Sequence, residues 1–245
     1  VTYDGNDHVT GTPPSDGTDY AEGEEVTVLG NTGNLRRPGY GFIGWNTEPD
    51  GTGETREVGS TFAMPAEDVT LYAQWKDDYA IGERGPAGGW IFYDHGSLHP
   101  DGWRYLEAAP GDVSDGATET FAWSNVTSAS VGVTSTDIGS GEANTALIVA
   151  QTGHDSSAAQ RTIDYTTDQL GGSFGDWFLP SRNELGLMYT NLRDESIGDF
   201  SDAASGYWSS FEGSASSAWY TRFDSGQDIN GFKDTPRLIR PVRAF

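Results

Sequence analysis

Histidine and carboxylate side chains are the groups of this 245-residue sequence that could bind a metal or transfer a proton. The four histidines are scattered, and no pair of them forms the His-Glu-x-x-His motif of zinc proteases. His95 and His99 could bind a metal together if the segment from Asp94 to Asp101 folded back, but a plain exposed loop is the favoured interpretation. We therefore expect no metal site and no cofactor.

Sequence motifs of the common enzyme classes are absent. The sequence has no Cys, which excludes disulfides, thiolate metal ligands and cysteine nucleophiles. It has no Gly-x-Ser-x-Gly elbow, Walker loop or dinucleotide fingerprint, and Gly51-Thr52-Gly53 is better interpreted as a hairpin turn. Two carboxylates could meet as in glycosidases, but sequence spacing cannot establish the separation of about 5–9.5 Å that this chemistry uses. We expect a protein that is not an enzyme.

Charge and hydropathy limit the partners. The formal net charge of −23 disfavours nucleic acid and anionic membrane surfaces, because both are bound by Lys and Arg clusters. No apolar run reaches the ~20 residues of a membrane helix, so no membrane insertion is expected of this fragment, and no signal segment opens it. The 33 Gly and the many aromatic residues predict strands and loops with few helices.

Residues 1–76 carry short alternating runs between Gly, Asn, Asp and Pro clusters, which predict a small sheet domain. Its most specific stretches are Gly39-Tyr40-Gly41-Phe42-Ile43-Gly44-Trp45-Asn46-Thr47, Asp50-Gly51-Thr52-Gly53 and Met64-Pro65-Ala66-Glu67-Asp68-Val69-Thr70-Leu71-Tyr72-Ala73-Gln74-Trp75. These stretches resemble the Listeria-Bacteroides repeat, an internalin B-repeat-like β-grasp module. The resemblance implies a spacer or adhesive stalk, which is followed by a short junction at Lys76-Asp77-Asp78.

The residues after this junction predict a second domain, of the α+β class. Helices are expected at residues 142–151 and 158–165 from their apolar spacing. The strongest signal is Ser181 with Glu184, whose capping-box spacing predicts a helix over residues 182–192. Strands are expected at residues 88–93, 103–109, 207–210, 218–223 and 238–243.

The order of motifs in residues 79–245 resembles the bacterial DUF1566 family. The motifs are Gly85-Pro86-Ala87-Gly88-Gly89, Asp176-Trp177-Phe178-Leu179-Pro180-Ser181, Tyr207-Trp208-Ser209-Ser210, Ala218-Trp219 and Arg240-Pro241-Val242-Arg243. The resemblance implies a C-type-lectin-like, sulfatase-modifying-factor-like domain. Sulfatase-modifying enzymes use cysteine, which is absent, and the only lectin-like calcium triplet, Glu48-Pro49-Asp50, lies in the other domain. Neither activity is expected.

The C-terminal run Arg240-Pro241-Val242-Arg243-Ala244-Phe245 resembles the constant end of variable proteins from diversity-generating retroelements. In those proteins adenine-directed mutagenesis rewrites Asn codons, which can become many residue types but not Trp, Met, Glu, Gln or Lys. Between Ser209 and Leu238 only Glu212, Trp219, Gln227 and Lys233 fall outside that set, where framework residues are expected. The expected variable region is 205–245, with variable positions at Phe211, Gly213, Ser214, Tyr220, Arg222, Asp224, Asp228, Asn230, Phe232, Asp234 and Thr235.

Such a surface would bind a partner with its aromatic side chains and adaptable polar groups, as antibody paratopes do. For each of the aromatic residues Phe211, Tyr220 and Phe232, packing in the core is the competing interpretation. The sequence predicts a non-enzymatic receptor-binding protein that is extracellular or displayed on a cell or virion surface. Its expected ligand is a protein or receptor on the surface of another cell or virus. The alternative is an invariant adhesin or envelope-associated structural protein of the same fold.

Overall fold

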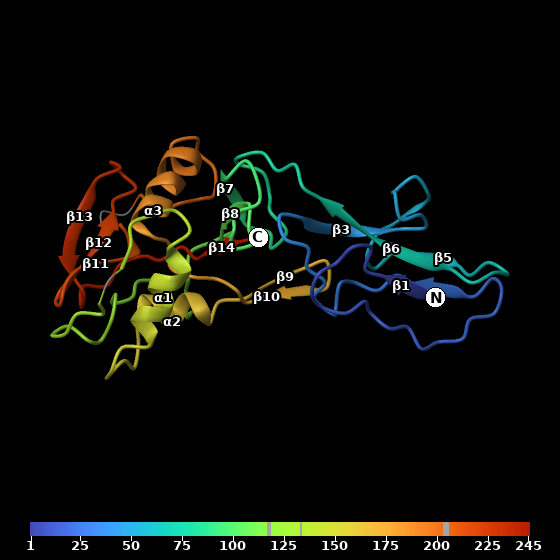
Figure 1. Ribbon diagram of the computed structural model, residues 1–245, viewed down its shortest axis with the longest axis horizontal. Helices are drawn as coiled ribbons and strands as arrows, with labels where there is room; N and C mark the ends of the chain where they lie inside the picture. The colour runs from blue at the N-terminus through green and yellow to red at the C-terminus, as the bar shows by residue number, and fades with distance from the viewer. Residues whose placement is uncertain (117–118, 133, 203–205) are drawn as a thin grey trace.

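The computed structural model describes residues 1–116, 119–132, 134–202 and 206–245. It is elongated, with the N-terminal repeat at one end and the sheet of the last forty residues at the other (Figure 1). Strands and small sheets predominate and helices are few, which agrees with the expected α+β class.

The N-terminal part is built on a mixed sheet of order β1-β6-β3-β4, in which only β1 and β6 run parallel. Trp45 is fully buried at its centre, and its indole N–H donates to the carbonyl of Leu29 at 2.8 Å. The strands of this part are β1 (Thr2–Asp4), β2 (Glu25–Thr27), β3 (Gly41–Asn46), β4 (Thr55–Arg56), β5 (Thr61–Ala63) and β6 (Thr70–Lys76), with β2 and β5 forming a separate pair.

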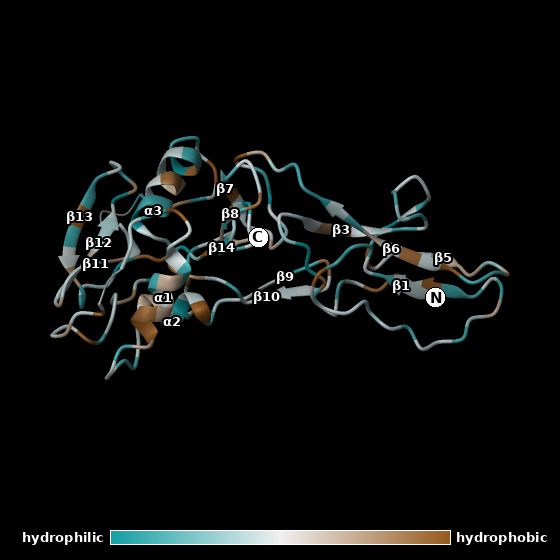
Figure 2. Ribbon diagram, viewed as in Figure 1, coloured by the Kyte–Doolittle hydropathy of each residue, from teal (hydrophilic) through white to brown (hydrophobic). Residues whose placement is uncertain are grey.

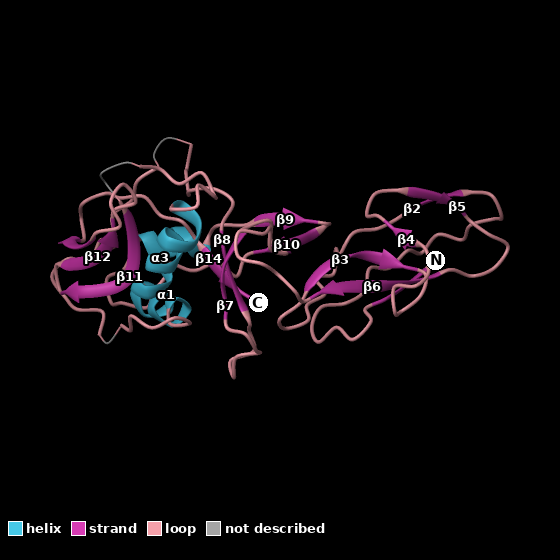
Figure 3. Ribbon diagram, turned by 90° about the horizontal axis from the view of Figure 1, so that it is seen from above, coloured by secondary structure: helices cyan, strands magenta, loops and turns pink. Residues whose placement is uncertain are grey.

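The C-terminal part contains three small antiparallel sheets and its helices (Figure 3). The sheets comprise β7 (Trp90–Asp94), β8 (Tyr105–Ala108) and β14 (Val242–Ala244); β9 (Thr167–Gln169) and β10 (Gly172–Phe174); and β11 (Tyr207–Ser214), β12 (Ser217–Thr221) and β13 (Asp228–Phe232). The helices are α1 (Gly141–Val149), α2 (Ala158–Ile163) and α3 (Arg182–Met188), with a π-helical turn at Tyr189–Arg193.

The predicted capping box at the start of α3 is confirmed. The Ser181 hydroxyl accepts from the Glu184 N–H at 3.2 Å, and the Glu184 carboxylate accepts from the Ser181 N–H at 2.6 Å. The α-helix ends at Met188, four residues before the predicted end, because the chain continues as a π-helical turn to Arg193.

The predicted strand over residues 238–243 is wrong in extent. Only Val242–Ala244 is a strand, and it pairs with β8 rather than with the sheet of β11 and β12. Pro241 has no N–H for a ladder. The preceding Arg240 is 1% exposed and donates to the Asp112 carboxylate at 2.7 Å. The third strand of the last sheet is β13, which the sequence did not predict.

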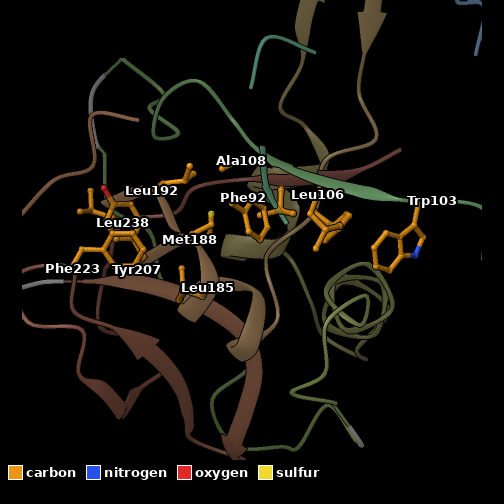
Figure 4. Packing of buried hydrophobic residues seen from close by; sticks show 12 residues of the cluster. Phe92, Trp103, Leu106, Ala108, Leu185, Met188, Leu192, Tyr207, Phe223 and Leu238 are labelled. Atoms are coloured by element: carbon orange, nitrogen blue, oxygen red, sulfur yellow. The ribbon is translucent and has the colours of Figure 1, made fainter. Parts of the chain in front are cut away.

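Among the described residues, the two largest buried clusters of the C-terminal part form most of its core. One lies where α3 packs against the sheets, and it includes Phe92, Leu185, Met188 and Tyr207 (Figure 4). The other gathers around the fully buried Trp123 and Trp208. Both clusters contain side chains from the last sheet, so its strands are held from two sides.

Candidate binding surface

One face of the last sheet points into the core. The strand register places Trp208, Tyr220 and Ile229 side by side on this face, which we call the Tyr220 face. Trp208 and Ala218 are fully buried there, in contact with the cluster around Trp123. The indole N–H of Trp208 donates to a backbone carbonyl at 2.9 Å, so its one polar atom is satisfied.

The opposite face, which we call the Trp219 face, opens to solvent along β13. The register pairs Trp219 with Asn230 and Ser217 with Phe232. Along β13, Asp228, Asn230 and Phe232 are exposed while the residues between them are half-buried. Hydrophilic and hydrophobic colours alternate along this strand at the edge of the molecule (Figure 2). Phe232 is 69% exposed, the highest exposed fraction among the large apolar side chains of the described residues.

Most of the residues predicted from the sequence lie at the surface. Phe211 and Arg222 are half-buried and Tyr220 is buried. The eight exposed residues and Arg222 form what we call the distal surface: Gly213, Ser214, Arg222, Asp224, Asp228, Asn230, Phe232, Asp234 and Thr235. Ser205, the first residue of the predicted variable region, lies outside the described residues.

Tyr220 does not belong to the distal surface. It is 8% exposed, its ring packs edge-on against Trp208 at 5.7 Å, and the Arg237 guanidinium lies over it at 3.3 Å. The side chains of a strand alternate between faces, and the register sets Tyr220 opposite Trp208. The expectation of an exposed variable side chain is therefore wrong for Tyr220, whose packing is that of a core residue.

Glu212 and Lys233 connect the ends of β11 and β13 from inside. The Lys233 ammonium lies 2.6 Å from the Glu212 carboxylate, with side chains 0% and 4% exposed respectively. The same carboxylate accepts from the Val131 N–H at 2.9 Å, and the ammonium lies 4.7 Å from the Trp123 ring centroid. These two residues, expected to be framework, are buried beneath the sheet.

Trp219 and Gln227, also expected to be framework, lie nearer the surface. Gln227 is exposed and Trp219 is half-buried. The guanidinium of Arg182 lies 3.9 Å from the Trp219 ring and donates to the Asp228 carboxylate at 2.9 Å. Sequence reasoning missed Arg182 as part of this region, because its contact with the sheet depends on where α3 packs.

Charged groups at the β12–β13 turn pair with each other. Arg222 donates to the Asp224 carboxylate at 2.9 Å, and this hydrogen bond lowers the pKa of Asp224. The Thr221 hydroxyl donates to Asp228 at 2.6 Å. The distal surface thus offers short polar side chains and one exposed aromatic ring, a composition suited to non-covalent recognition.

Two buried carboxylates elsewhere have pKa values raised above the usual value of a Glu side chain. Burial raises the pKa of Glu184 to about 7, although backbone N–H groups of Ser181 and Gly139 donate to it. Burial also raises the pKa of Glu107, which accepts from Arg243 at 2.8 Å and from the Gly89 N–H at 3.1 Å. Both side chains hold loop backbone in place, which is a structural role.

The loop that carries His95 and His99 does fold back. The two imidazole rings are 5.1 Å apart, and His99 stacks on Trp103 at 4.5 Å. Within the described residues, no three His, Cys, Asp or Glu side chains gather as a metal site would require. The histidines are better explained by their packing on Trp103.

The motifs behind the DUF1566 resemblance are largely interior. Arg243 binds both Glu107 and Asp176, with the Asp176 contact at 2.6 Å. A Cβ on Gly89 would lie 2.4 Å from the carbonyl of Ala108, so this position needs glycine. These motif residues connect the glycine-rich loop, the segment before α3 and the last strand, so they indicate a fold rather than a reactive site.

Comparison with known proteins identifies the N-terminal part. Residues 1–74 match the Listeria-Bacteroides repeat domain. A putative membrane protein of Evansella cellulosilytica is 45% identical over 101 residues, which are 41% of this chain and 14% of that protein. A putative Gly-rich membrane protein of the same organism is 47% identical over 76 residues, 31% of this chain and 9% of that protein. The chain therefore spans only a small fraction of these relatives.

No helix in the part of the chain that the structure describes has the length and hydrophobicity needed to cross a bilayer. Residues 1–74 of this chain are a Listeria-Bacteroides repeat domain.

Proposed function

We propose that this protein is a non-enzymatic binding protein of the cell envelope or another extracellular or virion surface, in which the repeat is a spacer and the distal surface binds a protein partner. The C-terminal part is proposed to be a C-type-lectin-like domain of the DUF1566 type. Its distal surface is proposed to be diversified by a retroelement. The observation that carries the proposal is the separation of the open Trp219 face from the packed Tyr220 face.

The position of the distal surface supports recognition. It lies at the end of the molecule away from the repeat, where β13 is the outermost labelled element (Figure 1). A spacer at one end and a binding surface at the other would present that surface away from an anchoring point. The repeat and the membrane-protein relatives support an envelope location.

Burial supports diversification of selected positions. Eight of the eleven predicted variable residues are exposed, whereas Glu212 and Lys233, which Asn codons rewritten at adenine cannot encode, form a buried ion pair. Substitution at exposed positions usually changes stability by no more than about 0.5 kcal/mol. Folding would therefore tolerate replacement of the distal surface while the framework beneath it is kept.

The test is to sequence the gene from many members of a population, together with its genomic neighbourhood. The proposal predicts substitutions concentrated at adenine-derived codons for the distal surface, with Trp208, Glu212, Lys233 and the last six residues fixed. It also predicts a near-copy of this coding segment beside a reverse transcriptase gene. Sparse or evenly spread variation without such a copy would contradict diversification.

An invariant adhesin of the same fold is the second candidate. The observation that favours it is the surface position of Gln227 and Trp219, since neither residue can arise from the rewritten Asn codons. A fixed surface would still bind its partner through Phe232 and Trp219. The same sequencing distinguishes the two, because an adhesin predicts an unchanged distal surface within one population.

A further inference from the structure

The hairpin of β9 and β10 fixes the position of the C-terminal part against the repeat. The Asn31 N–H donates to the Leu170 carbonyl at 2.8 Å, and the Ser173 N–H donates to the Asn34 side chain at 2.8 Å. Gly30 and Gly171 pack so closely that a Cβ on Gly30 would lie 2.8 Å from the Gly171 Cα. The space enclosed between the two parts is therefore preorganised, which reduces the entropy lost when a ligand binds.

A pocket of about 190 Å³ lies in this junction. Its aromatic walls come from both parts of the chain: Tyr40, Phe42 and Trp75 from the repeat, and Phe174 and Phe245 from the C-terminal part. The volume is below the ~300 Å³ at which pockets for drug-sized molecules begin. A pocket of this size fits one aromatic ring with a small substituent.

Three arginines line the same pocket: Arg36, Arg37 and Arg243. Arg243 is neutralised by Glu107 and Asp176, at 2.8 and 2.6 Å. Among the described residues, Arg36 and Arg37 have no carboxylate within 4.0 Å of their nitrogens. The three arginines outnumber the two carboxylates, Glu107 and Asp176, so the pocket has a small excess of positive charge in a protein whose net charge is −23.

The guanidinium groups of Arg36 and Arg37 both lie over aromatic rings. Arg36 lies 4.0 Å from the centroid of Phe174 and donates to the Ser173 carbonyl at 2.9 Å. Arg37 lies 4.0 Å from the centroid of Tyr40. Burial, followed by repulsion from Arg243, lowers the pKa of Arg36 to about 10 even though Asp176 and Glu107 raise it, so an additional anion beside Arg36 would be favoured.

We propose that this pocket binds a small aromatic monocarboxylate, whose ring lies among Phe42, Trp75 and Phe245 and whose carboxylate pairs with Arg37 and Arg36. Arginine forms bidentate hydrogen bonds with carboxylates, and the ring fills the apolar part that an inorganic anion would leave empty. Asp176 also lines the pocket, but its carboxylate is paired with Arg243 at 2.6 Å. At physiological salt, charges more than about 8 Å away are largely screened, so the negative charge on the rest of the protein does not prevent binding. This site is independent of the distal surface.

The test is titration of the intact 245-residue chain with benzoate, followed through the indole N–H resonance of Trp75. Benzamide, the neutral analogue of the same shape, is the ligand control. We expect a saturable shift with benzoate, and affinity lower by at least about tenfold for benzamide and for Arg37→Gln, because each removes a charge-assisted hydrogen bond. Arg37→Lys keeps the positive charge but loses the planar guanidinium that can donate two hydrogen bonds to one carboxylate. It should therefore weaken binding to an intermediate degree.

Arg56→Gln is the matched protein control. Arg56 also stacks on an aromatic ring of the repeat, Phe62 at 4.5 Å, but it does not line the pocket, so its replacement should leave benzoate affinity unchanged. Absence of a saturable shift up to the solubility of benzoate would overturn the proposal. Equal affinity for benzamide, or equal weakening by Arg37→Gln and Arg56→Gln, would overturn it as well.

Discussion

The Tyr220 face and the Trp219 face belong to the same three strands but are built differently. On the first, Trp208 and Tyr220 pack against each other at the centre of a buried cluster. On the second, Asn230 and Phe232 extend into solvent. The difference teaches that one sheet can separate residues needed for folding from residues free to contact a partner, because side chains alternate between its faces.

The largest effect is expected from Trp208→Ala on the Tyr220 face. Trp208 is fully buried, and its indole N–H donates to the backbone carbonyl of Phe121 at 2.9 Å. The substitution leaves a large cavity and should lower the free energy of unfolding by about 5 kcal/mol. Chemical denaturation measures this loss, and a change below about 1 kcal/mol would mean that this face does not anchor the sheet.

Lys233→Met should have the next largest effect. It removes the cation that faces Glu212 at 2.6 Å and leaves a carboxylate buried without its charge partner. Breaking such a pair costs about 3–4 kcal/mol. Denaturation of the single variant and of Lys233→Met with Glu212→Gln tests this, since the double variant should recover part of the stability. No recovery would show that the charge imbalance is not the cause.

Tyr220→Ala is expected to reduce stability by about 3 kcal/mol, because a ring packed between Trp208 and Arg237 is lost. Tyr220→Phe is the conservative control and should retain most of the stability. Thermal unfolding of both variants measures the difference. Unchanged unfolding of Tyr220→Ala would instead place Tyr220 with the variable surface.

Glu184, in the first turn of α3, should make the free energy of unfolding depend on pH. Burial raises its pKa from 4.5 to about 7, so the folded chain keeps a proton that the unfolded chain releases between these values. The stabilisation is fully present below about pH 4.5 and is lost as pH rises through about 7. Relative to Glu184→Gln, the wild type should lose about 2–3 kcal/mol between pH 4.5 and 8. Parallel pH profiles of the two proteins would contradict this.

The smallest effect is expected from combined Ala replacement of Phe232, Asp234 and Thr235. All three are exposed. The free energy of unfolding should change by less than about 1 kcal/mol, with an unchanged denaturant dependence. A loss comparable with that of Tyr220→Ala would show that the Trp219 face contributes to folding.

Elements whose stabilising contacts lie within a few residues of each other could be predicted from the sequence. Ser181 and Glu184 have capping-box spacing because the box is formed within one turn, and the structure contains it. The resemblance of the N-terminal stretches to the Listeria-Bacteroides repeat is likewise confirmed, since residues 1–74 match that domain.

Features that depend on tertiary contacts could not be read locally. β13 consists of Asp, Ile, Asn, Gly and Phe, a composition that also suits a loop, and its pairing with β12 makes it a strand. The burial of Tyr220 follows from its register with Trp208, and the contact of Arg182 with Trp219 follows from the packing of α3. Neither leaves a signal in nearby residues.

The central claim is that the two faces separate folding from recognition, and two matched libraries test it most directly. One library randomises Gly213, Ser214, Asp228, Asn230 and Phe232; the other randomises Trp208, Ala218, Tyr220, Ile229 and Lys233. Displayed variants are scored for protease resistance. We predict that most members of the first library remain folded and that few members of the second do. Equal losses in both libraries would contradict the account.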